Sequence, residues 1–256
     1  MPKKNVPTST QAPYFHSFSR ESVHQDFYYS CLSRELSRLL RREVLTGKAK
    51  FGAGSAGKEL PQVVVARVFE PGDFYSGYYR DQSFMLAKEL ATPQQFFTML
   101  YGDADREAFS GGRQMINHYS TPLVDAEGNW LELKEQLNVA ASLSPVAGQI
   151  THAIGIAAAS KAYRQNSRLS TQTPFSNNGR EVSFCISGDA AAAEGIFFEA
   201  INAAGVMQIP LAFVILDDGY GISVPTEYQV TKGNISKILE GFRRKEGENG
   251  IDLYTL

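Results

Sequence analysis

Two short apolar runs separated by a helical segment dominate the pattern of hydrophobic and polar positions along the chain. Residues 181–186 and 211–216 each end in a turn signal, which is typical of buried strands. Between the two runs, apolar residues recur at helical spacing from Ile196 to Ala204, and Pro210 bounds the segment. A strand, a helix and a second strand predict a right-handed parallel unit, whose strands end at the same edge of one sheet.

The pattern predicts further helices around this unit. Residues 22–45 predict a long, basic, amphipathic helix with leucines on one face. Residues 92–100 predict a shorter helix, with a Thr cap followed by Pro at the first helical position. An Ala-rich segment at 150–165 predicts another helix, and the polar segment at 166–180 predicts a loop.

Composition and charge narrow the classes of protein and partner. With 256 residues and 43% hydrophobic content, the chain can bury the core of one α/β domain, which we expect at 21–256. Residues 1–20 are expected to form a flexible leader, because this end is basic and rich in Ser and Thr but lacks the apolar stretch of a secretory signal. The formal net charge of −2 indicates no general attraction to nucleic acid or to a membrane surface. The two cysteines, Cys31 and Cys185, lie far apart, which argues against a disulfide and fits a cytoplasmic location.

Each of the two predicted strands is followed by a turn that carries carboxylates. Asp189 follows the first strand, and Asp217 and Asp218 follow the second. Because both turns emerge at one edge of the sheet, Asp189 and Asp218 can converge. Magnesium commonly takes one or two carboxylates together with substrate phosphates, so this pair predicts a metal and phosphate site. The alternative is that Asp189 caps the following helix, which is a common function of Asp after a strand.

The two turns resemble a known signature. The segments 188–202 and 217–223 are similar to the thiamine diphosphate signature of the 2-oxo acid dehydrogenases, and more narrowly to the alpha half of their decarboxylating component. The resemblance implies a thiamine diphosphate-binding α/β fold. It implies that Mg²⁺ is bound by Asp189, Asp218 and the backbone carbonyl of Tyr220. It also implies cofactor contacts from the residues of both turns: Gly188, Asp189, Ala190, Ala191, Asp218, Tyr220 and Ile222.

Upstream segments extend the resemblance over most of the chain. Tyr79 and Arg80 resemble a Tyr-Arg pair whose guanidinium binds the cofactor's diphosphate, and the planar fork of guanidinium donors suits phosphate oxygens. Taken alone, an Arg beside aromatic residues is also typical of a surface stacking pair.

Two more segments are similar to the same family. Residues 112–119 resemble a segment found especially in branched-chain members, which makes His118 the candidate for the reacting end of the cofactor. Residues 144–149 resemble the segment beneath the bent cofactor, where Ser144 would contact it. Val146 would be the apolar wedge that holds the two cofactor rings in contact.

The sequence also departs from the family's pattern. Ala190 replaces a usual Gly, and its methyl group is tolerated only if the backbone keeps a negative φ. Asp217 and Asp218 replace a pair of Asn, which adds negative charge beside an anionic diphosphate and requires a metal or nearby cations. Gly148 stands where branched-chain members carry a Thr that helps to hold potassium. Leu216 stands where some relatives place an Arg on the diphosphate.

A glycine-rich segment near the amino end offers a different function. Residues 52–58 match both a G-x-G-x-x-G pattern and the first seven positions of a P-loop. However, Glu59 follows Lys58 where a P-loop needs Ser or Thr, and no apolar strand precedes the segment. We therefore expect a loop here, and a nucleotide-dependent enzyme remains only an alternative.

The resemblance implies a function for the whole protein. A thiamine diphosphate carbanion attacks a 2-oxo acid, carbon dioxide leaves, and the acyl group passes to the lipoyl group of a dihydrolipoyl acyltransferase. The segment 112–119 favours a branched-chain substrate, with pyruvate or acetoin as alternatives. A non-catalytic scaffold or regulatory module that keeps the fold is a further alternative.

The carboxyl end of the chain suggests a missing part. Residues 251–256 begin a strand-like run that stops without a partner. We therefore expect a polypeptide that is truncated at its C-terminus and inactive alone. Its beta subunit, separate or fused, would complete an oligomer such as a heterotetramer.

Overall fold

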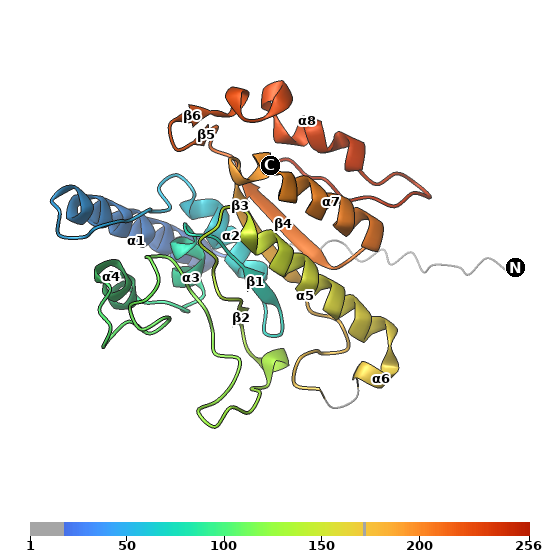
Figure 1. Cartoon of the computed structure of the whole chain (residues 1–256), viewed down its shortest axis with the longest axis horizontal. Coiled ribbons are helices and arrows are strands. Elements are labelled where there is room, and N and C mark those ends of the chain that lie inside the picture. The colour runs from blue at the N-terminus through green and yellow to red at the C-terminus, as the bar shows by residue number, and fades with distance from the viewer. Residues whose placement is uncertain (1–17, 171–172) are drawn as a thin grey trace, which may run out of the picture.

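A four-stranded parallel sheet forms the centre of the computed structural model, which describes residues 18–170 and 173–256 (Figure 1). The strands lie in the order β2 (Asn138–Val139), β1 (Phe74–Ser76), β3 (Ser183–Gly188) and β4 (Leu211–Leu216), and all neighbours are parallel. Every residue of β3 is buried. The strand is covered on both faces, which explains its continuous apolar run. The predicted α/β class is confirmed.

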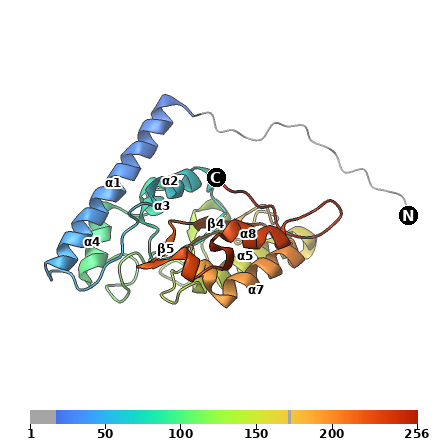
Figure 2. The same ribbon diagram turned by 90° about the horizontal axis from the view of Figure 1, so that it is seen from above.

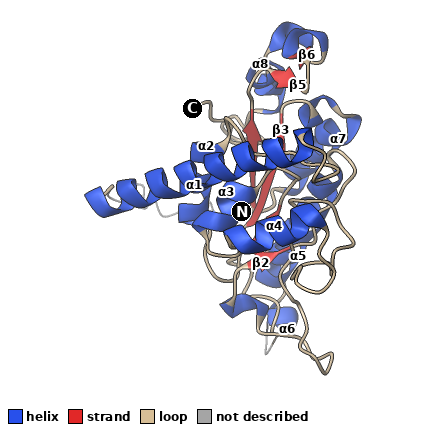
Figure 3. Cartoon of the chain, turned by 90° about the vertical axis from the view of Figure 1, so that its left-hand side faces the viewer, coloured by secondary structure: helices blue, strands red, loops and turns tan. Residues whose placement is uncertain are grey.

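Helices cover both faces of the sheet (Figure 3). On one face, Phe184 and Ile186 of β3 pack in a core with side chains of α1 (Arg20–Leu45), α2 (Glu59–Val68), α3 (Gln82–Ala87) and α4 (Pro93–Tyr101). On the other face, Cys185 packs with α5 (Gly148–Gln165) and α7 (Gly195–Met207). Successive residues of a strand point to opposite faces, so β3 joins the two cores. Figure 2 shows the two groups on opposite sides.

Short elements lie beyond the carboxyl ends of β3 and β4. The hairpin of β5 (Tyr220–Gly221) and β6 (Val224–Pro225) and the helix α8 (Ile235–Leu239) sit together at the top of Figure 1. Five 3-10 helices complete the described elements, at Leu133–Glu135, Ala191–Ala193, Thr226–Tyr228, Thr231–Gly233 and Glu240–Phe242. The hairpin and α8 therefore lie near the edge where the acidic turns are predicted to meet.

The predicted elements agree with the structure apart from their ends and one loop. The first strand spans Ser183–Gly188, two residues later at each end than the predicted 181–186, whereas β4 has the predicted bounds. Helix α1 begins two residues before the predicted start, because the hydroxyl of Ser19 accepts a hydrogen bond from the amide of Ser22 and caps the helix. The prediction of a loop at 166–180 is wrong for α6 (Ser167–Ser170), which continues the chain as a short helix.

Parts of the predicted leader and of the predicted loop cannot be compared with the structure. Residues 1–17 of the predicted leader lie outside the described residues, as do residues 171–172 of the predicted loop. Within the described ranges, no helix combines the length and the apolar character needed to cross a membrane.

Candidate functional site

The carboxyl ends of β3 and β4 bring the two acidic turns side by side. Gly188, the last residue of β3, pairs in register with Leu216, the last residue of β4. Asp189 follows directly, and Asp218 lies two residues beyond β4. Burial raises the pKa of Asp189 above its usual range, and the nearby charges of Asp218 and Asp217 raise it further. The two carboxylates thus share one edge of the sheet, as the spacing of the runs predicts.

The Asp189 carboxylate is held within its own turn and by the segment after β6. One oxygen accepts a hydrogen bond from the backbone amide of Ala190 at 2.9 Å, and the other accepts from the hydroxyl of Thr226 at 3.2 Å. The residue that caps α7 is Glu194, and no side chain there makes a capping hydrogen bond. Asp189 therefore does not cap α7. Its side chain is buried at the end of β3 instead.

Ala190 fits its position because its φ is −61°, which satisfies the condition that the methyl group imposes. A Cβ atom placed at Gly221 would lie only 2.8 Å from the Cβ of Ala190. The glycine at 221 therefore allows the β5–β6 hairpin to pack directly on the turn that carries Asp189. Ala191, the next residue, is buried in the short 3-10 helix that follows.

Lys58 reaches this edge from the glycine-rich loop before α2. Its ammonium lies 2.5 Å from a carboxylate oxygen of Asp218 and 3.3 Å from the carbonyl oxygen of Leu216. The lysine side chain is 7% exposed and the Asp218 side chain 43%. Helix α1 and a loop, rather than a strand, precede residues 52–58. This agrees with the expectation that the segment is a loop and not a P-loop.

The Tyr-Arg segment follows β1 and lies beside the end of β3. Arg80 donates a hydrogen bond to the carbonyl of Gly54 at 2.8 Å, and its guanidinium carbon lies 5.7 Å from the ring centroid of Tyr79. The stacking pair is therefore present, and the other donors of Arg80 have no hydrogen bond to a side chain among the described residues.

Tyr78, which precedes the Tyr-Arg pair, lies beside the last residue of β3. A Cβ atom placed at Gly188 would lie 3.9 Å from the Tyr78 hydroxyl, which is buried and has no hydrogen-bond partner in the part of the chain that the structure describes. Burial raises the pKa of Tyr78 well above its usual range, and Asp81 and Asp218 add to this while Arg80 opposes it. A neutral hydroxyl donor is thus left unpaired beside the end of β3.

His118 and Ser144 form a hydrogen-bonded pair before α5. The imidazole Nδ1 lies 3.0 Å from the carbonyl oxygen of Met115, and Nε2 lies 2.9 Å from the Ser144 hydroxyl. Ser144 and Val146 are exposed, and Ala147 adopts a left-handed backbone with φ of 65°. Gln149, in the first turn of α5, donates to the carbonyl of Ile186 at 3.3 Å, which ties this segment to the end of β3.

The β5–β6 hairpin presents two of the predicted residues to solvent. Tyr220 is 56% exposed, and its amide faces the second Asp218 oxygen at 3.3 Å. Ile222 is 96% exposed and has a φ of 59°, which is costly for a β-branched residue and is typical of functional sites. Leu216 is buried, so no side chain from this position extends toward the turns as an Arg would.

Comparison with known proteins decides the family. The family model "Dehydrogenase E1 component" matches residues 30–243, which is most of the chain. The chain belongs to this dehydrogenase E1 family. The family implies thiamine diphosphate as the cofactor.

The relatives of this E1 chain include alpha subunits named for 2-oxoisovalerate. It is 31% identical over 194 residues to the mitochondrial 2-oxoisovalerate dehydrogenase subunit alpha of Caenorhabditis elegans, covering 76% of this chain and 38% of that protein. It is 28% identical over 198 residues to the Bacillus subtilis subunit alpha, covering 77% and 51%. The mouse mitochondrial subunit is 28% identical over 238 residues, covering 93% and 47%. The chain thus spans about half or less of the length of these relatives.

The residues at this edge fit a divalent cation and a diphosphate. Asp189 is a buried carboxylate with an unusually high pKa, and a metal ion would offset its charge. Among the described residues no three His, Cys, Asp or Glu side chains gather as a metal site. Such a group of three is not required here, because the ligand set that the resemblance implies consists of two carboxylates and one backbone carbonyl. The unpaired Tyr78 hydroxyl and the free Arg80 donors suit phosphate oxygens.

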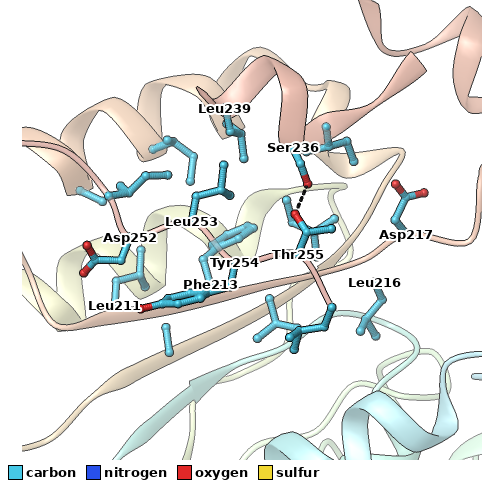
Figure 4. A pocket seen from close by; sticks show the side chains of 18 of the residues that line it. Leu211, Phe213, Leu216, Asp217, Ser236, Leu239, Asp252, Leu253, Tyr254 and Thr255 are labelled. Carbon is cyan, nitrogen blue, oxygen red and sulfur yellow. Dashed lines mark hydrogen bonds between the residues drawn. The ribbon is translucent and has the colours of Figure 1, made fainter. Parts of the chain in front are cut away.

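A cavity of about 990 Å³ lies along β4 and reaches this edge at one end (Figure 4). It is lined mainly by apolar side chains of β4, α8 and residues 250–256, including Leu211 and Leu253. Neither Asp189 nor Arg80 lines it, so most of the cavity lies away from the proposed cofactor contacts. Lys58, Asp217 and Asp218 line the part of the cavity that meets the acidic turns.

Three residues of the site are not predicted by the sequence analysis, namely Lys58, Tyr78 and Thr226. In the sequence, Lys58 stands out only as part of a P-loop pattern. The sole signal for Lys58 was the excess negative charge of Asp217 and Asp218, which requires a nearby cation. Nothing in the pattern around Thr226 indicates its hydrogen bond to Asp189.

Proposed function

We propose that this chain is the thiamine diphosphate- and magnesium-binding half of a branched-chain 2-oxo acid dehydrogenase. The observation that carries the proposal is the convergence of Asp189 and Asp218 at the ends of adjacent parallel strands, within a chain of the E1 family. Asp189, Asp218 and the carbonyl of Tyr220 would hold the metal ion. When bound, thiamine diphosphate supplies the electron sink that stabilises the carbanion left by decarboxylation.

The other residues would bind and orient the cofactor. The guanidinium of Arg80 and the hydroxyl of Tyr78 would donate hydrogen bonds to the diphosphate, with Tyr79 against the Arg80 guanidinium. The exposed apolar side chains of Val146 and Ile222 are available to pack against the rings. His118, whose Nε2 accepts from Ser144, is proposed to lie at the reacting end.

The proposed substrate is a branched-chain 2-oxo acid, and the proposed partners follow from the same family. The relatives quoted above carry 2-oxoisovalerate in their names, which favours this substrate over pyruvate. A beta subunit or fused beta half would complete the active site, and a lipoyl-bearing acyltransferase would take the acyl group. The location in the cytoplasm and the heterotetrameric state stay predictions.

Turnover by the full-length protein tests this function. The protein, with its beta subunit if that is separate, is assayed with 3-methyl-2-oxobutanoate and with pyruvate in thiamine diphosphate and Mg²⁺. We expect a higher kcat/KM for the branched substrate. Asp189→Ala should lower it by about 100-fold or more, because loss of outer-shell metal contacts alone costs roughly 10- to 100-fold.

An exposed carboxylate provides the matched control. Asp105→Ala, in the loop after α4, should leave kcat/KM unchanged. A preference for pyruvate would contradict the substrate assignment. Cofactor binding without decarboxylation of either acid would favour a non-catalytic scaffold.

A further inference from the structure

Among the described residues, the Lys58 ammonium makes two hydrogen bonds, one to the last residue of β4 and one to the turn that follows it. Its ammonium bonds the carbonyl of Leu216 at 3.3 Å and the carboxylate of Asp218 at 2.5 Å. A lysine is almost never buried unless it is paired, and this side chain is 7% exposed. The ammonium therefore fixes the Asp218 turn relative to the last residue of the strand.

The close packing of the glycine-rich loop against α1 determines where Lys58 lies. A Cβ atom at Gly52 would lie 2.7 Å from the Leu40 side chain, and one at Gly54 would lie 2.7 Å from the Ser37 hydroxyl. Both glycines thus let the loop lie directly on α1. The carbonyl of Gly54 also accepts the hydrogen bond from Arg80. One loop therefore supports both the arginine and the lysine of the site.

The charges at this edge explain why a lysine is needed. With an amide at 218, the pair at 189 and 218 would carry a single negative charge. Asp218 adds a second, and the ammonium of Lys58 cancels it at contact distance. The ammonium occupies only one oxygen of Asp218. The other oxygen faces the Tyr220 amide at a long 3.3 Å and keeps lone pairs for a metal ion.

We propose that Lys58 is a positioning residue of the metal and diphosphate site. Its ammonium holds Asp218 in place and gives the site the net charge that it would have with an amide at position 218. This inference rests on the proposed function and deepens it. It assigns the loop at 52–58, which resembles a nucleotide-binding motif, to the support of the cofactor site instead. Lys58 acts through Asp218 and does not itself bind the diphosphate.

The test is a double-mutant cycle in the full-length protein with Lys58→Met, Asp218→Asn and the double variant. Calorimetry measures the Kd of thiamine diphosphate at saturating Mg²⁺, and a thermal melt without cofactor reports the fold. Lys58→Met should weaken binding by about tenfold or more in the wild-type background, because it leaves Asp218 uncompensated beside Asp189. In the Asp218→Asn background the same change should alter Kd by less than about threefold. Lys88→Met, at a half-buried lysine after α3, is the matched control and should leave Kd unchanged.

Each other outcome overturns the inference. An equal loss of affinity in both backgrounds would mean that Lys58 binds the diphosphate directly, and an unchanged Kd would leave it a structural residue. Binding that is independent of Mg²⁺ in the wild type would mean that the ammonium replaces the metal. If the wild type binds no thiamine diphosphate, the proposed function fails as well. If Lys58→Met does not fold, the double variant is compared with Asp218→Asn. A Kd of the double variant that is tenfold weaker than that of Asp218→Asn contradicts the proposal.

Discussion

The Nε2 atom of His118 lies 2.9 Å from the hydroxyl oxygen of Ser144. The sequence placed the first residue at the reacting end of the cofactor and the second beneath it, from two separate segments. On the other side of the ring, Nδ1 lies 3.0 Å from the Met115 carbonyl, which can only accept a hydrogen bond. Nδ1 therefore carries the proton, and Nε2 accepts from Ser144. The backbone thus sets the tautomer of the proposed reactive histidine.

The tautomer of His118 can be measured directly. We expect long-range ¹⁵N NMR of the imidazole to show a protonated Nδ1 and an unprotonated Nε2 when the ring is neutral. Ser144→Ala should leave this tautomer unchanged, because the Met115 carbonyl remains. The same variant should lower the free energy of unfolding by about 1 kcal/mol, since this hydrogen bond is partly open to solvent and a typical one contributes about that much. A neutral ring protonated at Nε2 would contradict this geometry.

The strained backbone at Ile222 predicts an unusual effect of glycine. The φ of 59° costs a residue with a Cβ atom roughly 1–2 kcal/mol of stability. Glycine avoids this cost, but it lowers the free energy of unfolding by roughly 0.4–1 kcal/mol relative to alanine, because it increases the conformational entropy of the unfolded chain. Ile222→Gly should therefore be more stable than Ile222→Ala by about 0.5 kcal/mol in urea unfolding. Both variants should weaken thiamine diphosphate binding to a similar extent, because both lose the exposed side chain.

Val206 supplies the control for this comparison. It is exposed and lies inside α7, where glycine costs about 1 kcal/mol relative to alanine. Val206→Gly should accordingly be less stable than Val206→Ala, which is the opposite sign. If glycine is also the less stable residue at 222, the strain at Ile222 is not present.

The buried carboxyl of Asp81 predicts a pH dependence of stability. Burial raises its pKa well above the usual range of an aspartate, although the Tyr75 side chain and the Tyr78 amide, which donates to it at 2.6 Å, act in the opposite direction. The folded chain thus binds more protons than the unfolded chain, so stability falls as pH rises from about 3.8 toward the folded pKa. Asp81→Asn should be more stable than the wild type at pH 7 in urea unfolding, and the difference should vanish near pH 4.

Glu107 predicts the opposite dependence and serves as a check. Burial acts to raise its pKa, but the Ser110 hydroxyl and three backbone amides together lower it below 4.5. Its contribution to stability is present above pH 4.5 and is lost as pH falls through the folded pKa. Glu107→Gln should therefore destabilise the chain at pH 7 and have little effect at low pH. The same sign for both variants would contradict the environments described for these carboxyls.

The capping box of α4 predicts a simple loss of stability. Thr92 accepts from the Gln95 amide, and the Gln95 side chain accepts from the Thr92 amide. Thr92→Ala should cost about 1 kcal/mol in urea unfolding, whereas Thr92→Ser should cost much less. Equal losses in the two variants would show that the cap does not hold the helix.

The parts of the fold that were predicted correctly are those with strong local signals in the sequence. Strand β4 has the predicted bounds, and β3 is shifted by two residues at each end. Both strands were recognisable because strands covered on both faces require continuous apolar runs, which stand out in the sequence. Helix α4 was recognisable from its Thr cap and Pro. In contrast, β1 and β2 have three and two residues, which is too short for any periodic signal.

The candidate site was predictable only where local patterns carry it. Asp189 and Asp218 follow apolar strands, so parallel topology alone brings them to one edge. Lys58 lies 160 positions from Asp218, and its contact depends on how the loop packs on α1, which no local pattern encodes. Thr226 approaches Asp189 only because the hairpin folds back over Ala190. The sequence analysis therefore found the strand ends and missed the residues that reach them from elsewhere.

Calorimetric titration of thiamine diphosphate into the full-length protein, with Mg²⁺ and then with chelator, tests the central claim most directly. We predict binding that requires Mg²⁺ and is lost in Asp189→Ala, while Asp105→Ala binds like the wild type. Binding of equal strength in Asp189→Ala, or no binding by the wild type, would contradict the assignment of this edge of the sheet as the cofactor site.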